Sequence, residues 1–165
     1  MLIQVFHNSR RDEVGRATAM MDGYQASDPL THVFDLELTE AEAADINWPD
    51  RVYDLLNIGD DPAYGTPDDR AVAYRLPRNR SLSVGDVLVA YADWPHARGR
   101  SAAQQPETLA LAVIGSGADG AANGVALAVA SFDFESVRVN PGQVVNALHH
   151  GTTPIGWPLA PQDTA

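Results

Sequence analysis

The sequence predicts a single α+β domain, with a mainly antiparallel or small barrel-like sheet and three to four short helices. The chain has 165 residues, of which 45% are hydrophobic and 20% are charged, the composition of a globular domain with a real core. Short apolar runs alternate with turn-forming residues, and the late runs are joined by loops, which favours antiparallel pairing. We expect the domain to span residues 1–151, with a proline-rich tail at residues 152–165.

The first two expected elements are a strand and a helix. Leu2–Phe6 is an apolar run that ends at the turn-forming residues Asn8 and Ser9, so it predicts a strand. Asp12–Tyr24 carries apolar residues at roughly helical spacing and ends near Gly23, which predicts a helix.

A second strand and a second helix are expected next. His32–Leu38 alternates polar and apolar residues, which is the two-residue period of a strand with one buried face. Thr39 lies three positions before Glu42, and this capping-box spacing predicts a helix over Glu40–Asp45. The strand therefore leads directly into the helix.

A longer helix is predicted between Asn47 and Gly59. Asn47 is a favourable N-cap, and the apolar residues after it share one helical face. Asp60–Asp69 is then a loop rich in aspartate, proline and glycine, after which Ala71–Leu76 is predicted to return to a strand. Pro77–Asp86 is rich in turn formers and leads into the next strand.

The rest of the chain is expected to hold three strands, two loops and one helix. Three continuous apolar runs predict strands at Val87–Ala92, Thr108–Ile114 and Val125–Phe132. Residues 93–107 lack periodicity and are expected to form a mobile excursion, and residues 115–124 form a glycine-rich hairpin loop. Asn140 starts a last predicted helix, which ends at Gly151.

The charge of the chain is concentrated in one segment. Between Asp28 and Asp69 there are twelve acidic residues and one basic residue, so this segment carries a net charge of −11, which equals that of the whole chain. Such a concentration predicts an acidic surface that attracts a basic protein surface. Eleven carboxylates are the candidates for this partner-binding surface: Asp35, Glu37, Glu40, Glu42, Asp45, Asp50, Asp54, Asp60, Asp61, Asp68 and Asp69.

Composition also argues against several classes of protein. The chain has no cysteine, which excludes disulfides and thiolate metal sites and favours a cytoplasmic protein. The apolar start at Met1–Phe6 is too short for a signal peptide or a membrane span, so we expect no membrane partner. The net charge of −11 disfavours direct binding to nucleic acid.

No group of residues matches a catalytic or metal-binding motif. The aspartates of Asp60–Asp69 are the best candidates for a divalent cation, but their spacing lacks the regular alternation of calcium loops. His32 is a candidate general base with no defined nucleophile beside it. We therefore predict no catalytic residue, no metal ligand and no cofactor.

The one basic cluster is formed by Arg75, Arg78 and Arg80. Three arginines close together in the sequence could hold an anion. The favoured interpretation is that they pair with the carboxylates of Asp60–Asp69, which would make them part of the fold.

Two further passages resemble a known family. Asn79–Val87, which contains the sequence RSLSVGD at residues 80–86, resembles the YodL-like domain of phage and plasmid proteins and small actinobacterial proteins. Ala130–Phe134 resembles the Ser-Phe-Gly-Phe element that closes that domain, with Asp133 in place of glycine, and residues 55–65 and 71–75 resemble the segment that leads in. Residues 93–124 are an insertion relative to the family. The resemblance implies a mobile-element or host-interaction role and brings no known catalytic residues.

Charge and resemblance together favour a non-enzymatic, cytoplasmic interaction or regulatory protein of mobile-element origin, whose acidic surface engages a basic protein. Two alternatives stay open. One is a DNA mimic of the anti-restriction type, which requires carboxylates spaced along one face. The other is a metal-dependent hydrolase or transferase that uses His32 or the Asp60–Asp69 loop with a divalent ion.

Overall fold

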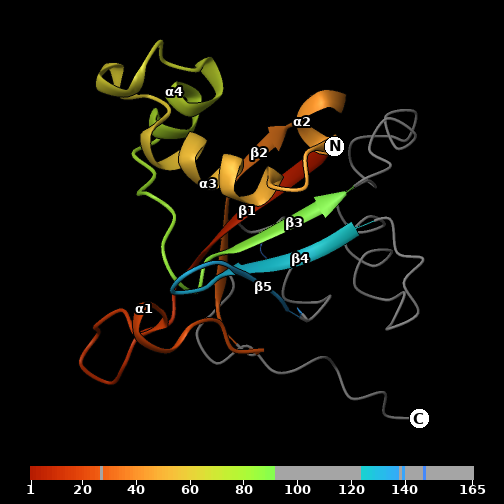
Figure 1. Ribbon diagram of the computed structural model, residues 1–165. Helices are drawn as coiled ribbons and strands as arrows, with labels where there is room; N and C mark the ends of the chain where they lie inside the picture. Colours follow the sequence, from red (N-terminus) through yellow and green to blue (C-terminus); the bar gives the residue numbers. More distant parts are fainter. Residues whose placement is uncertain (27, 92–123, 138, 140–146, 148–165) are drawn as a thin grey trace.

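Five strands form one antiparallel sheet in the part of the chain that the structure describes (Figure 1). The structure is a computed structural model, and it describes residues 1–26, 28–91, 124–137, 139 and 147. The strands are β1 (Leu2–Asn8), β2 (Leu30–Glu37), β3 (Val87–Tyr91), β4 (Gly124–Val129) and β5 (Phe134–Ser136). Their order across the sheet is β2-β1-β3-β4-β5, and the sheet stays open. The predicted α+β class is confirmed, in its antiparallel-sheet form and not as a barrel.

Short helices lie in the connections between the first three strands. Within the described residues the helices are α1 (Ala19–Asp22), α2 (Glu40–Ala44), α3 (Trp48–Ile58) and α4 (Asp69–Arg75), with a 3-10 turn at Pro62–Tyr64. α2, α3 and α4 all lie in the connection between β2 and β3. None of the helices in the described residues has the length and apolar character needed to cross a lipid bilayer.

β1, an interior strand of the sheet, is buried on both faces. Because side chains alternate along a strand, Ile3 and Val5 face one side of the sheet and Leu2 and Phe6 face the other. Ile3 and Val5 belong to one core cluster with Val52 and Leu56 of α3 and Tyr74 of α4: the helices therefore cover this face. A second cluster on the opposite face gathers Leu2, Phe6, Leu30, Val87 and Val89.

Local sequence signals set the ends of α2 and α3. Thr39 and Glu42 form the predicted capping box, in which the Thr39 hydroxyl accepts from the Glu42 amide and the Glu42 carboxylate accepts from the Thr39 amide. Asn47 is the N-cap residue of α3, although its side chain makes no capping hydrogen bond. Gly59 ends α3 with its amide bonded to the carbonyl of Leu55 at 3.0 Å. Both predicted helices are confirmed.

The predicted strand at Ala71–Leu76 is wrong, because this segment is the helix α4. The Asp68 carboxylate accepts from the Arg70 amide at 2.8 Å and so caps the start of the helix. Ala71 and Tyr74, three positions apart, are the buried residues of α4. The apparent alternation of the sequence Ala-Val-Ala-Tyr thus conceals a helical face.

The predicted helix at Asp12–Tyr24 is also largely wrong, since only Ala19–Asp22 is helical. Residues 11 and 17 form an isolated antiparallel bridge, and Gly15 between them has a φ of +83°, which breaks a helix. The Asp12 carboxylate accepts from the amides of Val14 and Arg16 and holds the turn. A narrow turn precedes a single helical turn.

The late strands agree with the prediction in part. β3 and β4 occupy the apolar runs expected there and pair antiparallel, but β4 ends at Val129 and the chain turns through residues 130–133 into β5. The unpredicted strand β5 thus lies just beyond the expected Val125–Phe132 run. The predictions for residues 93–107, Thr108–Ile114 and 152–165, and for all but the last residue of the 115–124 loop, fall outside the described residues. Of the predicted helix after Asn140, only Ala147 is described, and it is helical and buried.

The outer side of β2 is engaged by two side chains. β2 lies at the edge of the described sheet. The carbonyl of Val33 accepts from Asn79 Nδ2 at 3.3 Å, and the carbonyl of Glu37 accepts from Arg70 Nη1 at 3.2 Å. α4 and the loop after it therefore satisfy backbone acceptors that an edge strand leaves free.

Candidate functional site

The eleven candidate carboxylates lie on two sides of the molecule. Asp35 and Glu37 on β2 pair with Gln4 and Leu2 of β1, and paired residues in an antiparallel sheet point to the same face. Leu2 belongs to the cluster on the face away from α3, so Asp35 and Glu37 also lie on that face. The other nine carboxylates belong to α2, α3, α4 and the loops between them. Nine of the eleven candidate carboxylates therefore lie on the helical side of the sheet, and two lie on the opposite side.

Four of these nine carboxylates are half-buried, and each has an arginine partner. Arg70 binds both Glu42 and Asp68, at 2.9 Å and 2.8 Å. Hydrogen bonds from Arg70 lower the pKa of Glu42 to about 2 and also lower the pKa of Asp68. The other two pairs are Arg51 with Asp45 at 2.7 Å and Arg75 with Asp60 at 3.6 Å. Each of these four carboxylates is therefore compensated by an arginine of the same chain.

The remaining five carboxylates on the helical side are exposed. They are Glu40, Asp50, Asp54, Asp61 and Asp69. None of them forms an ion pair with another described residue, although Asp61 accepts from the Ala63 amide at 2.9 Å and caps the 3-10 turn. The helical side therefore presents net negative charge to solvent.

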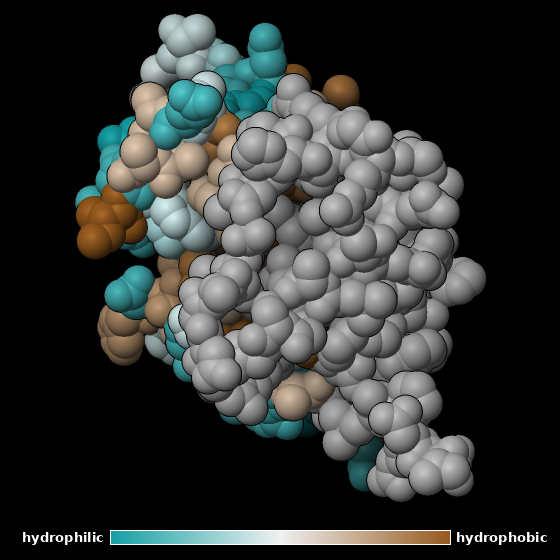
Figure 2. Space-filling model, turned by 90° about the vertical axis from the view of Figure 1, so that its right-hand side faces the viewer, coloured by the Kyte–Doolittle hydropathy of each residue, from teal (hydrophilic) through white to brown (hydrophobic). Residues whose placement is uncertain are grey.

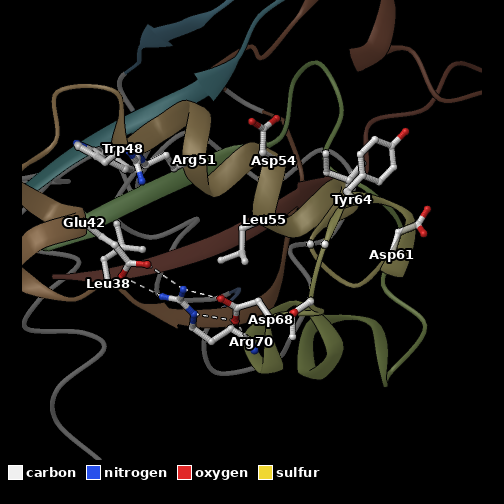
Figure 3. Close-up of a pocket in the computed structure, with 14 residues that line it drawn as sticks. Leu38, Glu42, Trp48, Arg51, Asp54, Leu55, Asp61, Tyr64, Asp68 and Arg70 are labelled. Carbon is white, nitrogen blue, oxygen red and sulfur yellow. Dashed lines mark hydrogen bonds and ion pairs between the residues drawn. The ribbon is translucent and has the colours of Figure 1, made fainter.

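A groove of about 350 Å³ lies between α2, α3, the 3-10 turn and α4 (Figure 3). We call it the α3 groove. Its apolar and aromatic lining residues are Leu38, Trp48, Leu55, Ile58 and Tyr64, and its charged lining residues are Glu42, Arg51, Asp54, Asp61, Asp68 and Arg70. Figure 3 shows Arg70 between Glu42 and Asp68 on one side of Leu55, with Asp54, Tyr64 and Asp61 on the other side.

The charges of the α3 groove do not cancel. Four carboxylates and two guanidinium groups line it, so its net charge is −2. Both guanidinium groups are already paired, Arg70 with two lining carboxylates and Arg51 with Asp45. Asp54 and Asp61 are the lining carboxylates without an arginine among the described residues. The net charge of the groove is therefore complementary to that of a cation.

The sequence alone did not indicate this groove. Tyr64 lies in the Asp60–Asp69 segment, which the sequence predicts to be a loop rich in aspartate, proline and glycine. Tyr64 is 70% exposed, and the groove brings it close to residues of α3. No short spacing in the sequence relates Leu38, Leu55 and Arg70, which meet only through the folding of three helices.

A second, smaller hollow of about 240 Å³ lies between α3 and the turn that joins β4 to β5. Tyr53, Phe132 and Phe134 line it together with Asp50. The Phe132 side chain is fully exposed. Figure 2 shows that hydrophilic and hydrophobic residues are interleaved along the part of that view formed by described residues.

The predicted pairing of the three arginines with the Asp60–Asp69 loop holds for Arg75 and is wrong for Arg80 and Arg78, since Arg78 forms no ion pair with another described residue. Arg80 binds Asp86 through both terminal nitrogens, at 2.6 Å each. Asp86 is fully buried, and it also accepts from the amides of Asn8 and Ser83. A buried carboxylate requires such compensation, so Arg80 is held by the turn before β3.

The same region contains a buried histidine and tyrosine. The Tyr74 hydroxyl donates to the Arg80 carbonyl at 2.6 Å, so it accepts from His7 Nε2, which lies 2.7 Å away. Burial lowers the pKa of His7 to about 4 and raises the pKa of Tyr74 to about 12. Both side chains are therefore neutral at pH 7 and act as a structural link between β1 and α4.

The described part of the chain contains no assembled set of metal ligands of the kind that the metal-dependent alternative requires. No three histidine, aspartate or glutamate side chains come together there in a group that could hold a metal ion. His32, the candidate base, binds Asp35 at 2.8 Å on the face of the sheet away from the helices. The acidic helical side with the α3 groove is the candidate functional site.

No family model matches the sequence, and no curated protein or solved structure is significantly similar to it.

Proposed function

We propose that this protein is a non-enzymatic interaction protein, whose acidic helical side binds a basic surface of a partner protein. The observation that carries the proposal is the set of five exposed carboxylates without arginine partners among the described residues on α2, α3, α4 and the intervening loop. Their neighbours Glu42, Asp45, Asp60 and Asp68 are compensated within the chain, so the exposed five are the charges available to a partner.

Exposed carboxylates contribute mainly to the rate and the orientation of binding. A single exposed ion pair contributes up to about 1 kcal/mol, whereas a field of like charges accelerates the encounter with an oppositely charged protein. Tight binding also requires buried apolar contact at the centre of the interface. The α3 groove, with Trp48, Leu55 and Ile58 among its lining residues, lies on the same side and supplies such a surface.

The proposed setting is the bacterial cytoplasm and a phage or plasmid origin. The support is the absence of cysteine and the resemblance of residues 79–87 and 130–134 to the YodL-like domain. A regulator carried by a mobile element that acts on its host needs a surface that binds a host protein, and the acidic helical side is the surface proposed for this role.

Affinity capture with a charge-neutralised variant tests the proposal. The purified chain is immobilised and exposed to an actinobacterial lysate, in parallel with a variant that carries Glu40→Gln, Asp50→Asn, Asp54→Asn, Asp61→Asn and Asp69→Asn. We expect a basic protein to be retained by the wild type and lost with the variant. The purified partner should then bind in calorimetry with an affinity that falls steeply as salt is added.

The matched control is the double variant Asp35→Asn/Glu37→Gln, which removes charge from the opposite face of the sheet. It should retain the partner. Equal capture by the five-residue variant, or a partner that is itself acidic, would contradict the proposal. Capture of a nuclease that loses its DNA in competition with this chain would support the DNA-mimic form of the same idea.

A further inference from the structure

We infer that the α3 groove receives one arginine side chain of the basic partner. This inference rests on the proposed function and deepens it, because it specifies the anchor of the interface. The groove has room for one long side chain, since its volume of about 350 Å³ is at the small end of ligand pockets.

The charge of the groove selects a cation. Asp54 and Asp61 line the groove without an arginine among the described residues, whereas Glu42 and Asp68 already share Arg70. Figure 3 shows Asp54 and Asp61 on the side of Leu55 away from Arg70, so an incoming cation would not have to displace that arginine. An anion would meet four lining carboxylates and only guanidinium groups that are already paired.

The apolar lining selects arginine among the cations. Tyr64 supplies an aromatic ring on the same side of Leu55 as Asp54 and Asp61 (Figure 3), and a guanidinium group stacks on an aromatic ring and loses less hydration than an ammonium group. Leu55 and Ile58 supply aliphatic surface for the methylene stem of the side chain. The planar guanidinium also offers donors in two directions, which suits carboxylates from two different segments.

The groove can be tested without knowing the partner, with N-acetyl-arginine amide as the probe. The ¹⁵N-labelled full chain is titrated with the probe, and the backbone amide signals of Asp54, Asp61 and Tyr64 are followed by NMR. We expect a saturable shift of these signals. The neutral isostere N-acetyl-citrulline amide should leave them unchanged.

Single variants locate the binding charge. Asp54→Asn and Asp61→Asn should each weaken the probe by about fivefold, the loss expected for one ion pair. An asparagine side chain can still cap the 3-10 turn, so Asp61→Asn keeps the local fold. The matched control is Asp50→Asn, which removes an exposed charge one helical turn before Asp54 and outside the groove. Its affinity for the probe should equal that of the wild type.

Three results would overturn the inference. They are the absence of a saturable shift, equal shifts with the citrulline isostere, and unchanged affinity in the Asp54→Asn/Asp61→Asn double variant with a native spectrum. Equal affinity for N-acetyl-lysine amide would overturn the choice of arginine.

The two proposals fail in different ways. If the probe does not bind while capture still requires the five exposed carboxylates, the groove assignment is wrong and the proposed function stands. If the probe binds while the five-residue variant keeps every captured protein, the proposed function is wrong. The assignment of an arginine to the groove as part of that interface then falls with it.

Discussion

Arg80 and Asp86 form a bidentate ion pair across the turn before β3, with both nitrogen–oxygen distances at 2.6 Å. The carboxylate is fully buried, whereas the Arg80 side chain is 45% exposed. The Asn8 amide at the end of β1 donates to the same carboxylate at 2.8 Å. This pair therefore fixes the RSLSVGD passage to β1 and gives the passage a structural role.

Replacement of the buried carboxylate should destabilise the protein. Asp86→Asn keeps the shape but removes the charge, so we expect the free energy of unfolding to fall by about 2 kcal/mol, the range for hydrogen bonds to charged groups. The loss stays below that of a fully buried pair because water can solvate Arg80. Urea unfolding measures it. Asp69→Asn, at an exposed position, should change stability by less than about 0.5 kcal/mol, and an equal effect of both variants would contradict this account.

The buried, neutral His7 should make the free energy of unfolding depend on pH between about 4 and 6.5. Its folded pKa is about 4, below the ordinary value of 6.5, so the unfolded chain binds more protons between these values. The contribution is complete above pH 6.5 and is lost as pH falls toward 4, by up to about 3 kcal/mol. His7→Gln keeps a donor for Tyr74 and should flatten the free energy of unfolding between pH 7 and pH 5. The same slope in wild type and variant would be evidence against a buried neutral His7.

Gly85 should tolerate no side chain. Its φ is +89°, and an added Cβ would lie 2.7 Å from the Cβ of Ala19. Gly85→Ala should cost about 2–3 kcal/mol, from the backbone strain and the overlap together. Gly15→Ala is the matched control, because Gly15 has a similar φ of +83° with open space around it, and it should cost about 1 kcal/mol. Adding Ala19→Gly should recover part of the difference, and thermal unfolding of the three variants shows whether it does.

Arg70 should set the pKa of Glu42. The carboxyl pKa is lowered from 4.5 to about 2, so the contribution to stability is present above pH 4.5 and is lost as pH falls toward 2. Arg70→Gln should return the pKa of Glu42 toward its ordinary value in a ¹³C NMR titration of the side-chain carboxyl. The cost in stability at pH 7 should stay at or below about 1 kcal/mol, because solvent screens this half-exposed group. A Glu42 pKa that stays low in the variant would show that the Thr39 cap, and not Arg70, causes the shift.

Local signals in the sequence predicted the parts of the fold that depend on neighbouring residues. Thr39 and Glu42 are three positions apart, and their capping box forms as expected. The sequence misled where distant contacts decide the conformation. Tyr74 is buried against His7, 67 positions earlier, and this contact makes the helical face of α4 the buried one. The alternating residues of the same segment favoured a strand.

The candidate site was predictable in its charge but not in its shape. The clustering of acidic residues along the sequence identified the eleven carboxylates, and nine of them lie on the helical side in the structure. Their compensation was not visible, because Arg70 is 28 positions from Glu42. The groove was not visible either, since Leu38, Asp54 and Tyr64 come from three separate segments. Spatial convergence of this kind leaves no periodic mark in the sequence.

The two side chains on the outer side of β2 also oppose the addition of a further strand at this edge of the described sheet. A strand from a second molecule that paired along β2 would compete for the backbone acceptors of Val33 and Glu37, which Asn79 and Arg70 already hold. Pairing along the full length of β2 would require both contacts to break. The fold thus opposes the first step of amyloid-like stacking at β2 by a means that does not depend on the net charge of the protein.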